Sequence, residues 1–465
     1  MCPPIMGGHF PPFALVVSVL TLASCAHVAN IPEEEKSQDV AAPEARCVQH
    51  EELVFEGPKP TARMVSVYPM MDGSVVVACS YSPQLGHWAS SESPRAAAVL
   101  VKPGQPTQIA YVPWDLEPPG HPARRHGLVA DFFAGPDGVV KVALFAAAEE
   151  AARATVRTWK LRVGEKGLSF DPDANFECPL GEPTLGTSRY DLTTIVESTA
   201  ARSRYVCFGS YEKGNVEALG VIVGEPVRYW WKWVAVCATD DASEISLRPL
   251  FTTGRYEEVE VRHDVNYPSR DQVVVVGAQA LVAAVKFVTF PRKTHKVCLS
   301  RFDLEKQEVL ATEELYEFPY GSAYVQALHL AATSNDVVVA LSLTVPQGRT
   351  AARVVLVFQQ TAGQWLKPVR LAGRALALTT DSDGAFWLLY NDGARLFVAK
   401  GIGREWSPAF RLEYPFDPSW FLTMESHTGL SVGPGGAAHL AVAADTRVFY
   451  CRYLFAADPK HPAAP

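Results

Sequence analysis

Short runs of β-branched and aromatic residues, separated by turn residues, recur along almost the whole chain. Examples are Ser74–Ala78, Val139–Leu144, Val273–Val276, Val337–Ala340 and Phe386–Tyr390. Runs of this kind are typical of β-strands. A helix is expected over one short segment only, near Ala146–Thr155, which is rich in Ala and Glu. The pattern therefore predicts an all-β fold.

Seven turn signals separate pairs of these strands. Four are rich in glycine, at Asp72-Gly73, Gly135–Gly138, Asp381–Gly384 and Gly433–Gly436, and three weaker ones lie at Ala200–Arg202, Gly277 and Ser334–Asp336. Glycine at such positions supplies the positive φ of a tight hairpin. The hairpin centres fall near residues 72, 137, 201, 278, 335, 383 and 435.

A third strand, and often a fourth, follows each hairpin, as at Ala98–Val101, Arg353–Phe358 and Arg395–Ala399. Four strands in roughly 40 to 60 residues form the blade of a β-propeller, in which blades close into a ring because none can bury both faces alone. The sequence predicts one seven-bladed β-propeller over residues 47–457. A six-bladed ring is the alternative, because residues 205–250 hold one strand more than their unit requires.

The last two units resemble the repeats of sialidase-like propellers and of propeller lectins, in which a strand, a glycine hairpin, a strand and a short third strand alternate. Asp383–Trp387 is also similar to the Asp-box of sialidases, although its spacing and its place in the blade differ. The resemblance implies the propeller fold over most of the chain. It assigns no catalytic residue.

The two chain ends are predicted to fasten the ring. The final unit, Ala437–Val442 and Arg447–Leu454, supplies only three strands, whereas Cys47–Phe55 has strand character and no hairpin of its own. A blade left at three strands would expose an unpaired edge. We therefore expect residues 47–55 to form the outermost strand of the last blade, antiparallel to Arg447–Leu454. That pairing makes Cys47 and Cys451 a candidate disulfide, provided that their Cα atoms lie within about 7 Å.

The N-terminus carries a targeting signal. The apolar run Phe13–Leu22 is too short to span a bilayer, and it ends in Leu22-Ala23-Ser24-Cys25, which resembles the lipobox of bacterial lipoproteins. The resemblance implies a signal peptide over residues 1–24, lipidation of Cys25 and, with Ala26 following, an outer-membrane location. An ordinary secretory peptide cleaved nearby is the alternative. Residues 25–46 are predicted to be a flexible tether and residues 458–465 a disordered tail.

Composition and motifs exclude several classes of function. The formal net charge of −8 disfavours a nucleic-acid partner. Gly429–Gly433 matches the nucleophile-elbow pattern around Ser431, but a hairpin follows where that device needs a helix. Phosphate-loop, dinucleotide-binding and zinc motifs do not occur. We expect no cofactor and no metal.

One set of residues indicates a ligand site. The segments that lead into the innermost strands line the mouth of a propeller's central channel. Counting back from the turns gives the candidate ligand-binding residues His126, Tyr190, Tyr267, Tyr324 and His427, and Arg270 lies beside them. Tyrosine faces stack on sugar rings, and Arg or His can bond to hydroxyl and carboxylate groups. A plugged channel, a binding site and a catalytic site are the three interpretations left open.

These patterns favour a lipid-anchored propeller outside the cytoplasm that recognises or assembles with a glycan or an envelope protein. The alternative function is a polysaccharide-active enzyme, a lyase or glycosidase, that uses His, Tyr and Arg at the mouth. The sequence names no catalytic residue for it.

Overall fold

The structure of the protein is a computed structural model. It describes residues 43–54, 61–82, 95–113, 129–147, 153–164, 167–179, 188–197, 205–213, 230–238, 245–249, 270–288, 292–348, 350–393, 395–416, 427–444 and 447–455. The predicted signal peptide, Cys25 and the C-terminal tail 458–465 lie outside these residues. In the described ranges nearly every element is a β-strand, and no helix there is long and apolar enough to cross a membrane.

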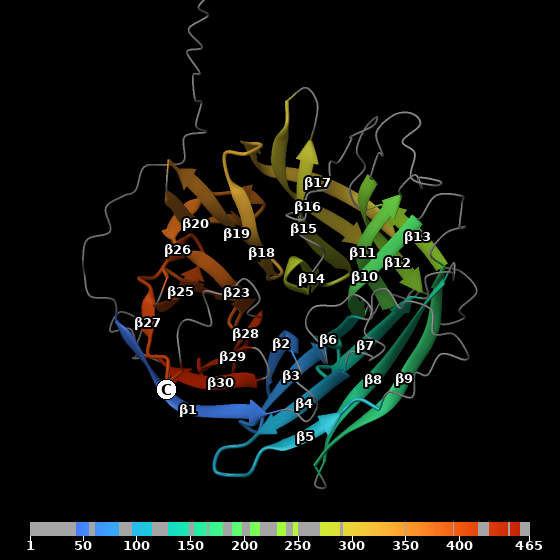
Figure 1. Ribbon diagram of the computed structural model, residues 1–465, viewed down its shortest axis with the longest axis vertical. Helices are drawn as coiled ribbons and strands as arrows, with labels where there is room; N and C mark the ends of the chain where they lie inside the picture. Colours follow the sequence, from blue (N-terminus) through green and yellow to red (C-terminus); the bar gives the residue numbers. More distant parts are fainter. Residues whose placement is uncertain are drawn as a thin grey trace, which may run out of the picture. The chain divides into compact units, whose positions relative to one another are not determined.

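The described strands form seven antiparallel units in chain order (Figure 1). Four are sheets of four strands, one is a sheet of five, and the last two share a nine-stranded sheet. Blade 1 is β2 (Thr61–Pro69), β3 (Val75–Ser82), β4 (Arg95–Val101) and β5 (Gln108–Tyr111), and blade 2 is β6 (Val129–Ala134), β7 (Val140–Ala147), β8 (Arg153–Gly164) and β9 (Gly167–Pro179). Blade 3 is β10 (Ser188–Glu197), β11 (Tyr205–Lys213), β12 (Trp230–Ala238) and β13 (Ile245–Pro249). Blade 4 is β14 (Val273–Val276), β15 (Gln279–Val288), β16 (Thr294–Asp303) and β17 (Glu308–Pro319), preceded by the short 3₁₀ turn η1 (Arg270–Gln272).

The remaining blades lie toward the C-terminus. Blade 5 is β18 (Tyr324–Ala332), β19 (Asp336–Gln347) and β20 (Thr350–Thr361), with β21 (Gln364–Trp365) and β22 (Val369–Ala372) sharing its outer edge. Blade 6 is β23 (Arg374–Thr380), β24 (Phe386–Asn391) and β25 (Leu396–Ile402), with β26 (Glu405–Trp406) and β27 (Phe410–Leu412) at its edge. Blade 7 is β28 (His427–Val432), β29 (Ala438–Ala444), β30 (Arg447–Leu454) and β1 (Glu44–Val54).

Apolar packing between neighbouring blades explains why these strands are apolar on both faces. In β24 all six residues are buried. One face of blade 5 packs on blade 4 through Leu328 and Val339, and its other face packs on blade 6 through Val338. The same arrangement joins blade 7 to blade 1, where Val65 packs with Tyr450. The ring therefore closes with seven blades, as the sequence predicted, and the six-bladed alternative is excluded.

Close approach of the first and last blades requires a glycine at 429. A Cβ on Gly429 in β28 would lie 2.7 Å from the carbonyl oxygen of Val65 in β2. Ser431 lies in the same strand, opposite His439, and no helix follows it. Gly429 of this elbow-like motif therefore allows blade 7 to pack closely on blade 1.

The sequence prediction of a helix near Ala146–Thr155 is wrong at its two ends. Ala146 and Ala147 belong to β7, and they pair with Thr155 and Ala154 of β8. The residues between the strands, 148–152, lie outside the described ranges. Ladder hydrogen bonds between β7 and β8 override the high helix propensity of the alanines at these positions.

The N-terminal strand closes the ring as predicted. β1 pairs antiparallel with β30 from Arg46↔Leu454 to Val54↔Arg447, and Figure 1 shows β1, in blue, beside β30, in red. β1 begins at Glu44, and its first two residues also pair, in parallel, with β27 of blade 6. A single strand therefore joins the edges of the last two blades.

The predicted disulfide at this seam is not formed. Cys47 and Cys451 are both free thiols. A bulge between Cys47 and Gln49 places Cys47 opposite Tyr453 and leaves Cys451 opposite His50. The two cysteines are therefore diagonal neighbours, for which Cα separations of about 7 to 8 Å are usual, beyond the reach of an unstrained disulfide.

Candidate functional site

The predicted mouth residues fall at the start of the inner strands wherever the structure describes them. Tyr190 lies in β10, Arg270 begins η1, and His427 begins β28. Tyr324 is the first residue of β18, and its side chain is 49% exposed. His126 and Tyr267 lie outside the described residues.

Blades 4 and 5 provide the best-described part of the mouth. The last pair of β15 with β16 is Val288↔Thr294, and Thr294 in turn pairs with Pro319, the last residue of β17. The turn before β16 and the connection from β17 to β18 are consequently at the same end of blade 4. Tyr320 and Tyr324 lie on that connection and at its end.

A stack of aromatic rings holds this connection. The ring of His295 lies 5.1 Å from that of Phe318 and 5.6 Å from that of Tyr320, nearly parallel to both. The backbone N–H of Tyr320 donates to the carbonyl of Lys293 at 3.0 Å, and the Lys293 ammonium lies 6.0 Å from the centre of the Tyr320 ring. Tyr320 remains 39% exposed. The arrangement is a preformed surface of aromatic and cationic groups.

A histidine further along the inner strand β18 lies near a carboxylate of η1. η1 contacts β10, β14 and β18, so it lies among the inner strands of blades 3, 4 and 5. Nδ1 of the buried His329 in β18 is 3.5 Å from the carboxylate of Asp271 in η1. Neither ring nitrogen of His329 has a hydrogen-bond partner in the part of the chain that the structure describes. Asp271 itself is exposed.

Sequence reasoning identified Tyr324 and Arg270 but missed the groups beside them. Lys293 lies in the turn before β16, His295 in β16 and Tyr320 directly after β17, and counting back from the inner hairpins does not reach these positions. The sequence feature that could have identified these groups is the basic run Arg292, Lys293, His295 and Lys296 in an acidic protein. His329 is flanked by Leu328 and Leu330, so its pattern was that of a core strand.

A second polar cluster lies buried between blades 2 and 3. Lys141 is 1% exposed and is paired with Glu197, and its ammonium lies 3.7 Å from Asp173. Tyr205 and Thr158 donate to Asp173, and Lys160 is 2.9 Å from it. A Cβ on Gly135 would lie 2.6 Å from the Glu197 carboxylate, so glycine leaves room for the pair. Because Lys141, Asp173 and Glu197 are buried, this cluster is an ionic contact between blades 2 and 3.

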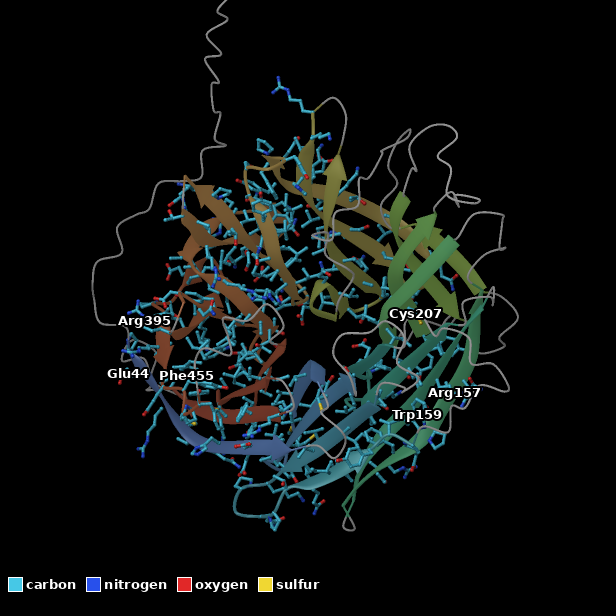
Figure 2. The ribbon with its side chains drawn as sticks, viewed as in Figure 1. Glu44, Arg157, Trp159, Cys207, Arg395 and Phe455 are labelled. Atoms are coloured by element: carbon cyan, nitrogen blue, oxygen red, sulfur yellow. The ribbon has the colours of Figure 1, made fainter. Side chains whose placement is uncertain are left out.

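An open hollow at the seam is lined by Glu44, Arg395, Leu396, Arg411, Leu412, Glu413 and Tyr414, with a volume of about 340 Å³. Figure 2 labels Glu44 and Arg395 there. Arg395 pairs with Asp392 at 2.5 Å, and Arg411 lies 3.9 Å from Glu44. Because its guanidinium groups already face carboxylates, this hollow offers less to an anion than the mouth does.

The seam also holds an unusual thiol. Burial and the Cys47 sulfur raise the pKa of Cys451. The pKa of Cys47 is lowered to about 6, mainly by a hydrogen bond from the Cys451 thiol and further by Gln49 and His50, against the effect of burial. Since the folded protein favours the thiolate, Cys47 contributes stability above the unfolded thiol pKa of about 8.5. That contribution is lost as the pH falls through about 6.

We predict that Cys47 is alkylated by iodoacetamide with a rate that rises through a midpoint near pH 6. Replacing the donor in Cys451→Ala should move that midpoint toward the ordinary thiol value of about 8.5. Peptide mapping after brief alkylation at a series of pH values measures both. A wild-type midpoint at the ordinary value would contradict the hydrogen-bonded pair.

The strand topology and the mouth define the class of the protein as a seven-bladed β-propeller. No family model and no curated protein matches the chain. Solved structures similar to it include an α-L-arabinanase from Penicillium chrysogenum, with 10% identity, a TM-score of 0.40 and coverage of 86% of this chain and 98% of that one. They also include an α-L-arabinofuranosidase from Fusarium graminearum, with 9% identity, a TM-score of 0.44 and coverage of 88% and 98%. A sialidase from Trypanosoma rangeli has 8% identity, a TM-score of 0.40 and coverage of 88% and 60%.

Proposed function

We propose that this propeller is a recognition module that binds a glycan at the mouth formed by blades 4 and 5, and that Cys25 anchors it by lipid to the outer membrane. An envelope protein is the alternative partner. The observation that carries the proposal is the pair of exposed tyrosines, Tyr320 and Tyr324, at the connection from β17 to β18, with the Lys293 ammonium over the Tyr320 ring. Exposed aromatic rings on a rigid scaffold suit the apolar faces of sugars, and neighbouring polar groups suit their hydroxyls.

The tyrosines provide the test. We predict that the double variant Tyr320→Ala/Tyr324→Ala binds a glycan selected on a broad array more weakly by about 1 to 3 kcal/mol, by analogy with stacking on other aromatic platforms. Isothermal titration calorimetry measures the affinity. The melting temperature should change little, because both rings are substantially exposed.

Ile402→Ala is the matched control, since Ile402 is also exposed but ends β25, at the end of blade 6 opposite to the start of its inner strand β23. Its glycan affinity should equal that of the wild type. A wild-type protein that binds no glycan on the array would leave a protein partner as the function of this surface.

The anchor is tested separately. We predict that Cys25→Ser moves the protein from the membrane fraction to the soluble extracytoplasmic fraction, because a serine at that position cannot accept the thioether-linked lipid. Fractionation followed by immunoblotting measures the distribution. Membrane retention of the variant would contradict lipidation at Cys25.

A polysaccharide lyase or glycosidase is the second candidate, and the Asp271–His329 pair favours it. A buried imidazole whose Nδ1 lies 3.5 Å from a carboxylate has the composition of a general base. An assay for glycan depolymerisation distinguishes the two functions. An enzyme depolymerises the bound glycan, and its turnover falls by orders of magnitude in the His329→Gln variant. A binding module releases the glycan intact.

A further inference from the structure

The strand directions place the start of β1 at the end of the ring opposite the mouth. In blade 7 the inner strand β28 begins at His427, at the mouth, and ends at Val432, where the hairpin to β29 follows. Val432 pairs with Ala438, and Ala438 pairs in turn with Tyr453 near the end of β30. Since β1 runs antiparallel to β30, its first residues lie at this hairpin end, beside Leu454.

The turns that follow the inner strands form this end, which we call the hairpin face; they include residues 70–74, 333–335, 381–385 and 433–437. Three apolar side chains at its level are strongly exposed: Met71 of blade 1 (93%), Ile402 of blade 6 (56%) and Leu454 of blade 7 (46%). β1 pairs with blades 6 and 7, and blade 7 packs on blade 1, so these side chains belong to the blades around the start of β1. Apolar groups in this position suit the interfacial region of a bilayer.

The chain between Cys25 and β1 is short compared with the ring. Residues 26–43 separate Cys25 from Glu44, the first residue of β1. An unstructured chain of about 18 residues has a root-mean-square span of about 25 Å and reaches at most about 60 Å. The inner strand β18, with nine residues, rises about 27 Å from the mouth to the hairpin face. With the mouth against a bilayer, the chain from Cys25 would have to pass this whole height before it reached Glu44. With the hairpin face against the bilayer, it begins at the right end.

We propose that the hairpin face lies against the membrane and that the mouth points away from it. The ligand is then a glycan presented from the aqueous side, and not a sugar headgroup of the lipids around the anchor. This inference rests on the proposed lipid anchor and glycan site, and it specifies where that glycan comes from. The exit of the chain at Glu44 carries it, and the exposed Met71, Ile402 and Leu454 support it.

The experiment measures which face is nearer the lipid. The mature protein, lipidated at Cys25, is reconstituted on vesicles of phosphatidylethanolamine and phosphatidylglycerol that carry an energy-transfer acceptor on a lipid headgroup. A fluorescent amino acid is introduced as the donor at the exposed Asn335, in the hairpin of blade 5, or at Tyr324, at the mouth end of the same inner strand. Energy transfer should be at least about twofold more efficient from position 335, because the two positions lie about 30 Å apart along β18.

The Cys25→Ser variant with the same donors is the control and should show no transfer from either position. The glycan affinity of the vesicle-bound protein should equal that of this soluble variant, because the mouth stays open to water. Equal transfer from the two positions, stronger transfer from position 324, or a lower glycan affinity on the vesicle overturns the orientation and leaves the anchor and the glycan site intact. Failure of the protein to remain on the vesicle overturns the anchor, and absence of glycan binding in both forms overturns the glycan site.

Discussion

Leu53→Asp is expected to lower the free energy of unfolding more than any other single substitution at the seam. Leu53 is 2% exposed in β1 and packs in the apolar cluster between blades 7 and 1. The substitution removes a buried aliphatic side chain and places a carboxylate among Val448 and Tyr450. We expect a loss of at least about 4 kcal/mol in the free energy of unfolding. Denaturant unfolding monitored by tryptophan fluorescence measures it.

Val48→Asp is the control on the same strand. Val48 lies at the bulge and is 44% exposed, so the same charge introduced there should change the unfolding free energy little. Equal losses in the two variants would mean that the cost of the new carboxylate does not depend on burial, and the argument from burial at Leu53 would fail.

Glu197→Ala should be the second most destabilising change. It leaves the Lys141 ammonium, 1% exposed, without its closest carboxylate, and Asp173 at 3.7 Å already serves Lys160 and Tyr205. Breaking one partner of a buried ion pair costs about 3 to 5 kcal/mol. The same unfolding measurement applies. Adding Lys141→Met should recover much of the loss, because no unpaired ammonium is then buried.

The exposed pair Arg395–Asp392 supplies the comparison. Arg395→Ala should leave the unfolding transition unchanged, since both groups are reached by water and exposed pairs contribute little. If Glu197→Ala behaved like Arg395→Ala, the cluster between blades 2 and 3 would not be an ionic contact that holds them together.

The blades could be predicted because their signals are local. Each glycine turn specifies a hairpin by itself, and β2–β3 and β23–β24 form around Gly73 and Gly384 with the positive φ that the turns require. The closing strand could also be predicted, because a three-stranded last blade needs a partner and residues 47–55 had none. The register of that pairing could not be predicted, because no local sequence pattern indicates the bulge at Val48.

The site could be predicted only in part, for a related reason. Tyr324 was found because it precedes an inner hairpin at the expected distance. Tyr320 and Lys293 meet through turns whose proximity depends on how β15, β16 and β17 align, and Lys141 meets Glu197 across two blades. Such contacts follow from tertiary packing, which residue spacing along one chain does not determine.

The seam has a consequence for the order of folding. The strands of each inner hairpin are close in sequence, whereas Glu52 and Arg447, which bond across β1 and β30, are 395 residues apart. Contacts of such high sequence separation form late, because loop closure must first be overcome. Strand β1 is synthesised before the blades, but it is therefore among the last strands to pair. Until residue 454 is available, β1 and the edges of blades 6 and 7 present unpaired strands to other chains, so the period before ring closure is when this protein is most exposed to aggregation.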